Sequence, residues 1–152
     1  MIHFFNVMQE FQKVGLALFV ILGAVEIGMA CDFDGSRLIT CIAEKGIEYR
    51  GRDAPKNFVP ESVGLPDKFF VNFKDKLIVP TIDSLVRRTT PIQQSRHIED
   101  KLILQGTDEG VEGVEDGIGW SMAISKETGK FVISVSGTAV GYVVFGSCTC
   151  IE

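Results

Sequence analysis

The sequence has few of the side chains that enzymes use for proton transfer. Only two histidines occur among its 152 residues, and because His3 lies in an expected leader, His97 is the only imidazole of the remaining chain. Histidine is the side chain that most often acts as a general acid or base. Ser95, Glu99 and Asp100 lie near His97 in sequence, but no nucleophile elbow surrounds the serine, and sequence proximity is not triad geometry. We predict no catalytic residue and no enzymatic activity.

Long runs of positive charge are also missing. The chain carries 15 Lys and Arg against 20 Asp and Glu, a formal net charge of -5 at pH 7. Its densest basic spot is Arg87-Arg88 with Arg96 nearby, and so short a cluster is more typical of a solvated loop or strand edge than of an anion site. A phosphate backbone requires more cations than this. We therefore predict no nucleic-acid partner.

No apolar run is long enough for an ordinary membrane span. Val14 to Val25 is an uncharged stretch of 12 residues, whereas a spanning helix needs about 20 and the apolar core of a signal peptide about 7 to 15. Small residues at Gly28 and Ala30 favour cleavage between Ala30 and Cys31. Residues 1–30 are thus predicted to form a hydrophobic helix that acts as a signal peptide, and the product to be periplasmic or secreted.

Two alternatives keep a membrane contact open. The leader could be retained as an anchor, or Cys31 could carry a lipid after cleavage. The lipid alternative fits poorly, because Gly28 stands where lipoprotein signals have an aliphatic residue and Met29 where they have a small one. A start at Met8 would shorten the leader to an ordinary length.

The chain has four cysteines, Cys31, Cys41, Cys148 and Cys150. Past a signal peptide, four cysteines typically form two disulfides, with three possible connectivities. Cys148 and Cys150 share a strand face but are too far apart to bridge without strain. A hairpin turn at Asp34-Gly35 would place Cys31 and Cys41 on opposite faces. We therefore expect Cys31 and Cys41 to pair with Cys148 and Cys150, in an order that stays open.

The last third of the chain has the pattern of a β-meander. Short runs rich in β-branched or aromatic residues alternate with turn residues, and Gly129 can supply the positive φ that a short hairpin loop needs. Within one run, Trp120 falls on the apolar face that we expect to be core. The predicted strands are Lys101–Gln105, Ile118–Ser125, Phe131–Ser136 and Tyr142–Ser147.

The middle of the chain gives weaker signals. Frequent Gly and Pro between Glu44 and Asp67 predict mostly loop. Lys68 to Val79 alternates as a hairpin does, and Thr81 to Gln94 favours a strand that ends before Pro91 over a helical turn. Together these patterns predict one all-β domain, residues 31–152, as an antiparallel small barrel or sandwich of about seven to eight strands.

An acidic loop precedes Trp120. Five carboxylates lie within nine residues, and such loops can hold calcium, but the EF-hand spacing is missing. A solvated loop tip is the favoured interpretation, and calcium stays an alternative. We predict no cofactor and no metal site. The five residues are Asp108, Glu109, Glu112, Glu115 and Asp116.

Several phrases of the last third, among them Ile98-Glu-Asp-Lys-Leu-Ile-Leu-Gln-Gly and Gly119-Trp-Ser-Met-Ala-Ile, resemble small uncharacterised secreted proteins of proteobacteria. The resemblance implies a periplasmic β-domain and carries over no functional residue. A fainter likeness, in size and export, is to periplasmic inhibitors of c-type lysozyme, whose loop motif is not visible here.

The function that these observations favour is an exported, non-enzymatic binding or inhibitory module of the bacterial envelope. Its partner would be a protein or a small envelope ligand. Two alternatives are a structural subunit of an envelope assembly or surface filament, and an exported thiol or metal-binding protein that uses Cys148 and Cys150.

Overall fold

The computed structural model describes residues 31–110 and 117–151. The predicted signal peptide, with its helix and cleavage site, lies outside these residues, as do Glu112, Glu115 and Asp116 of the acidic loop. Residues 31–152 form one compact unit. In the part of the chain that the structure describes, no helix is long and apolar enough to cross a membrane.

The unit is built almost entirely from antiparallel strands. In chain order the elements are β1 (Ile39–Arg50), β2 (Lys56–Phe58), the 3-10 turn η1 (Pro60–Val63), β3 (Lys68–Asn72), β4 (Leu77–Pro80), β5 (Thr90–Pro91), β6 (Gln94–Ile98), β7 (Lys101–Asp108), β8 (Ile118–Ser125), β9 (Lys130–Ser136) and β10 (Val140–Cys150). The all-β antiparallel prediction is confirmed, as is the meander of the last third, where Gly129 has a φ of 67° in the β8–β9 turn. The described residues contain ten strands, not seven or eight, because the chain pairs in places where the sequence predicts loop.

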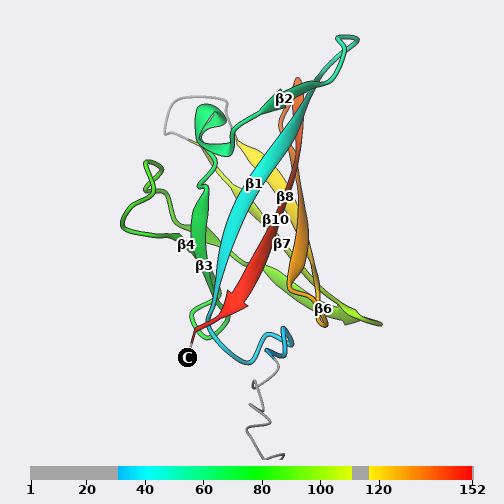
Figure 1. Ribbon diagram of the computed structural model, residues 1–152. Helices are drawn as coiled ribbons and strands as arrows, with labels where there is room; N and C mark the ends of the chain where they lie inside the picture. The colour runs from blue at the N-terminus through cyan, green and yellow to red at the C-terminus, as the bar shows by residue number, and fades with distance from the viewer. Residues whose placement is uncertain (1–30, 111–116, 152) are drawn as a thin grey trace, which may run out of the picture. The chain divides into compact units, whose positions relative to one another are not determined.

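One sheet, not two, contains all of these strands, so the sandwich alternative is wrong. Its order is β5-β4-β3-β1-β10-β9-β8-β7-β6, with β2 paired to β1. The two terminal strands, β5 and β6, follow one another in the chain. Between them the Ile92 amide donates to the Lys76 carbonyl beside β4, and the Gln93 amide donates to the Gln105 carbonyl in β7. The sheet therefore curls into a half-barrel, and its two edge strands, β5 and β6, are consecutive in the chain (Figure 1).

The inner face of the curled sheet carries the core. Alternate residues point inward, and on β8 these are the even-numbered Trp120, Met122 and Ile124, as the sequence predicts. The β1–β10 pairing defines the two ends of the fold. Ile39 faces Cys150 at one end, here called the disulfide end, and Arg50 faces Val140 at the other, here called the cavity end.

The prediction of mostly loop from Glu44 to Asp67 is wrong up to Arg50 and again at β2, which pairs with β1. β1 continues to Arg50, and between Ala43 and Lys45 its register against β10 shifts by a β-bulge. The bulge changes which residues point inward, so the period-2 signal that marks a strand is broken there. Beyond the bulge Gly46 is buried beneath the ring of Phe58, where no Cβ would fit.

The predicted hairpin at the start of the domain is also wrong. Asp34 and Gly35 do form a turn, in which an Asp34 carboxylate oxygen accepts from the Ser36 amide at 2.8 Å, but residues 31–33 before it are not a strand. Phe33 is buried instead, and its ring lies against Gly129 of the β8–β9 turn. A buried aromatic ring outweighs the small gain from one two-stranded hairpin.

Thr81 to Thr89 is not the strand that the sequence favours. Only Thr90–Pro91 pairs, with β4, and the preceding residues form a turn and an extended loop. The Lys68–Val79 hairpin is confirmed as β3 and β4, with Lys76 at a φ of 56° in its turn. The chain after β4 therefore leaves the sheet as a loop and returns to pair with β4 only at β5.

Candidate functional site

Two disulfides fix the disulfide end of the fold. Cys41 pairs with Cys148, directly across the β1–β10 ladder, with Cα atoms 4.0 Å apart, and Cys31 pairs with Cys150 at 5.7 Å. The expectation that the first two cysteines pair with the last two is confirmed, and the order is now given. Paired cysteines suggest an oxidising, extracellular or periplasmic environment. The thiol alternative requires free Cys148 and Cys150, and neither is free.

The cavity end of the sheet is hollow. A cavity of about 560 Å³ lies inside the curl, within the range of about 300 to 1,000 Å³ that is usual for small-molecule sites. Most of its wall is aliphatic or aromatic. The larger side chains of the wall are Val63, Leu65, Phe69, Ile78, Val86, Ile118, Trp120, Ile133, Val135, Val140, Tyr142 and Val144.

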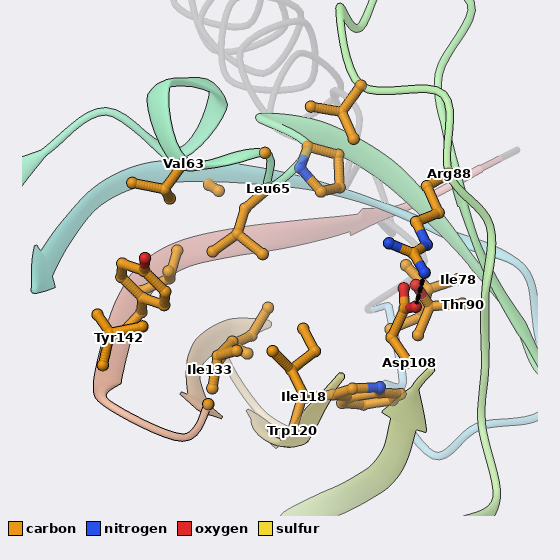
Figure 2. Close-up of a pocket in the computed structure, with 18 of the residues that line it drawn as sticks. Val63, Leu65, Ile78, Arg88, Thr90, Asp108, Ile118, Trp120, Ile133 and Tyr142 are labelled. Carbon is orange, nitrogen blue, oxygen red and sulfur yellow. Dashed lines mark ion pairs between the residues drawn. The ribbon is translucent and has the colours of Figure 1, made fainter. Parts of the chain in front are cut away.

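Three adjacent strands supply one wall, and the end of η1 with the residues after it supplies the opposite one. Figure 2 shows Ile118, Ile133 and Trp120 facing Val63 and Leu65 across the space. Tyr142 lies at one end of the cavity, where its ring meets Phe58 edge to face at 5.3 Å between centroids. Gly137 and Ala139, between β9 and β10, also line the wall. At the disulfide end, by contrast, Phe33 is buried.

One ion pair lies at the other end of the cavity. Arg88 and Asp108 are the only charged residues among the described residues of its wall. The guanidinium of Arg88 contacts the Asp108 carboxylate and donates to the Gly110 carbonyl, as Figure 2 shows for the ion pair. The Asp108 side chain is only 11% exposed. Since the two charges offset one another, the wall presents no net charge to an occupant.

Trp120 is the only tryptophan of the chain. It is 8% exposed, and its ring forms part of the cavity wall. Its indole nitrogen is buried and has no hydrogen-bond partner among the described residues. Gly106 lies opposite it on β7, and a Cβ there would meet the ring of Trp120. The sequence predicts this residue as core, and the structure shows that one side of that core is open space.

The cluster of Ser95, His97, Glu99 and Asp100 lies away from the cavity. Its residues are exposed on β6 and in the turn that follows, and none of them lines the wall. Asp100 forms an ion pair with Lys101 at 2.7 Å, and the Lys101 ammonium lowers its pKa. Within the described part of the chain, no hydrogen bond joins the Ser95 side chain to His97. The structure therefore does not assemble these residues into a triad.

The basic cluster and the acidic loop each contribute one residue to the cavity wall. Arg88 belongs to the cavity wall, whereas Arg87 and Arg96 do not. Of the five carboxylates of the acidic loop, Asp108 and Glu109 lie within the described ranges. Asp108 forms an ion pair with Arg88. In residues 31–110 and 117–151, no three His, Cys, Asp or Glu side chains are grouped to hold a metal ion.

No protein-family model, curated protein or solved structure matches the chain.

Proposed function

We propose that the domain is an exported, non-enzymatic binding protein of the bacterial envelope that holds a largely apolar small molecule inside its curled sheet. The observation that carries the proposal is the cavity of about 560 Å³ with its aliphatic and aromatic wall. A dry apolar cavity of this volume forfeits packing energy, so an occupant would recover it. Clefts of this kind, concave and mostly apolar with a few polar groups, are the usual form of ligand sites.

The wall also indicates the chemistry of the ligand. Its one ion pair has no net charge. For a charged ligand, the attraction of one partner is offset by the repulsion of the other, so the wall does not favour a ligand with a strong net charge. The remaining donors of the Arg88 fork can reach a carbonyl or hydroxyl oxygen. The class that fits is a chain or ring system of hydrocarbon character with one weakly polar end, such as an acyl ester.

Export is supported by chemistry outside the cavity. The two disulfides favour an oxidising compartment, and the uncharged stretch from Val14 to Val25 has the length of a signal-peptide core. A periplasmic location is the form of this proposal that agrees with the resemblance noted for the last third of the sequence.

A structural subunit remains the second candidate, because β6 ends the sheet and all five of its residues are exposed. Strand edges of this kind can pair with another chain. Arg96 on this strand argues against it, since charged side chains on an edge strand are a usual protection against such pairing. Concentration-dependent assembly, measured by sedimentation, would favour this second function.

The test uses Trp120 as its own reporter. Bromine quenches tryptophan on contact, so a long-chain fatty acid methyl ester brominated in mid-chain should quench the fluorescence of the full chain saturably. Because the chain has a single tryptophan, the signal arises only at the cavity wall. The corresponding brominated free acid, compared at the same concentrations, tests whether a charged end is disfavoured.

Two neighbouring residues of β9 provide a matched pair of variants. Ile133 lines the cavity, and Val132 is exposed on the outer face. Ile133→Phe places extra volume in the space that the ligand needs, and it should weaken ester binding by at least about tenfold, the factor that corresponds to losing burial of about two methylene groups. Val132→Phe should leave binding unchanged. Quenching that does not saturate, or that Ile133→Phe leaves intact, would refute the proposed function.

A further inference from the structure

The loop between β4 and β5 exposes two large aliphatic side chains. In this segment, residues 81–89 and hereafter the 81–89 loop, Ile82 is 87% exposed and Leu85 is 80% exposed. These are the highest values among the large hydrophobic residues that the structure describes as exposed. Single exposed aliphatics are ordinary, but two at the tip of one projecting loop form a feature that calls for an occupant.

Several contacts hold the tip in this conformation. The Ser84 amide donates to the Thr81 carbonyl at 3.1 Å, and the Ser84 side chain, 1% exposed, accepts from the Val86 amide at 3.3 Å. Asp83 forms an ion pair with Lys68 of β3 at 3.1 Å. Ser84 thus faces the body of the domain, whereas the Asp83 side chain is 59% exposed and reaches Lys68 at the surface. These contacts hold the loop in a conformation in which Ile82 and Leu85 are exposed to solvent.

The same loop continues into the cavity wall. Val86, Arg88 and Thr90 all line the cavity, and Figure 2 shows Arg88 and Thr90 at one end of it. Figure 1 shows the loop, in green after β4, projecting beyond the strands. The exposed aliphatics therefore lie within a few residues of the proposed binding space.

We infer that the 81–89 loop inserts Ile82 and Leu85 into a lipid surface, so that the domain exchanges its apolar ligand directly with a membrane. The inference rests on the proposed function for its purpose, because a ligand of hydrocarbon character is scarcely soluble and resides in lipid. The exposed Arg87 beside the tip adds the attraction that anionic headgroups exert on a juxtaposed cation.

A lipid surface suits this tip better than a protein groove does. Protein interfaces are anchored mainly by Trp, Tyr and Arg, and Leu is under-represented among their strongest contacts. Aliphatic side chains beside a basic residue are instead typical of elements that lie in the membrane interface. Continuity between the loop and the apolar cavity is the observation that decides for lipid.

The experiment places a reporter on the tip. Ile82→Trp is compared with Ile98→Trp, a control at the end of β6 where the native isoleucine is 55% exposed, and with the unchanged chain, whose Trp120 supplies the background. Full-length proteins are mixed with vesicles of phosphatidylcholine and phosphatidylglycerol, with or without phosphatidylcholine brominated on its acyl chains. An unchanged urea midpoint checks that each variant folds.

The expected result is that brominated lipid quenches the added tryptophan of Ile82→Trp and shifts its emission to the blue, whereas Ile98→Trp behaves as the unchanged chain does. This readout is local, so a retained hydrophobic leader cannot produce it. If the tryptophan at 82 is not quenched, whether or not the protein binds the vesicles, the inference is wrong. A dimer that Ile82→Ser with Leu85→Ser abolishes would assign the tip to a second copy of the chain and overturn it equally.

Loading from vesicles gives a second readout. Ile82→Ser with Leu85→Ser should slow the transfer of brominated ester from vesicles to Trp120 by about tenfold or more, the factor expected when burial of even one aliphatic side chain is lost. Quenching at equilibrium without vesicles should not change. Failure of that quenching in the unchanged chain refutes the proposed function alone, whereas unchanged transfer rates refute only the lipid contact.

Discussion

The two ends of one curled sheet differ in what fills them. At the disulfide end the inner face is covered by fully buried side chains, among them Leu102, Ile124 and Phe131, and Phe33 packs in from the chain before β1. At the cavity end the same strands carry Ile118, Ile133 and Tyr142, which are only partly buried around open space. The same strands are therefore fully packed at one end and border open space at the other. The difference lies in what packs against the inner face, because the side chains compared are of similar size.

The largest expected effect is the loss of both disulfides at the disulfide end. Loops of 107 and 119 residues are closed by the two bonds, but once either bond exists the other closes only a short additional loop. Removing one bond, by Cys31→Ala with Cys150→Ala, should therefore cost about 3 kcal/mol, and removing all four cysteines about 8 kcal/mol. Urea unfolding of the three proteins measures this. Equal costs for the first and second bond would contradict the loop argument.

Two isoleucines of β8 compare the ends directly. Ile124 is 0% exposed, and Ile118 points to the same inner face six residues earlier but lines the cavity. Ile124→Ala should lower the free energy of unfolding by about 3 to 4 kcal/mol, because it opens a void in packed core. Ile118→Ala should cost about 1 kcal/mol, since the side chain already borders empty space. Similar losses at both positions would mean that the cavity is closed in solution.

Two glycines extend the comparison to the turns. Gly129 and Gly64 both have positive φ, 67° and 77°, but a Cβ at Gly129 would approach the Cys148 carbonyl and the Phe33 ring, whereas one at Gly64 meets nothing within 4 Å. Gly64→Ala should cost about 1 to 2 kcal/mol, the strain of the left-handed conformation. Gly129→Ala should cost clearly more, because Phe33 must also move. Thermal or urea unfolding of the pair would show whether the disulfide end is as tightly packed as its burial indicates.

These contrasts explain what could be predicted from the sequence. Strands from Lys101 to Cys150 pair with their neighbours in the chain, and β8–β9 and β9–β10 do so through short turns, so alternation and turn residues are sufficient to find them. The pairing of the first two cysteines with the last two followed from the cysteine count and from the distance between Cys148 and Cys150, which is too long for a bridge within one strand. Burial in β1 beyond Ala43 depends on a bulge and on Phe58, which lies outside the strand, and no local pattern records that dependence.

The cavity could not be predicted for a different reason. Ile118, Ile133 and Tyr142 alternate in the same way as residues of a filled core, and only the curl of the whole sheet shows that nothing packs between them. Small residues at Gly137 and Ala139 are the one signal available, and they are equally typical of a turn. The 81–89 loop was missed because its conformation depends on Lys68 and on the burial of Ser84, both tertiary effects.

The smallest expected effect tests whether the charge of Asp83 helps to hold the 81–89 loop at the cavity end. The Thr81 hydroxyl, and then the Lys68 ammonium, lower the pKa of Asp83 to about 2 from an ordinary value of 3.8. A carboxyl whose pKa is depressed in the folded state contributes stability above its unfolded pKa and loses it as the pH falls through the folded value. The urea midpoint of the unchanged chain should therefore exceed that of Asp83→Asn slightly at pH 6, and the difference should shrink between pH 4 and pH 2. High salt should reduce it as well, because both partners are exposed. A difference that persists unchanged at pH 2 would show that Asp83 does not hold the loop through its charge.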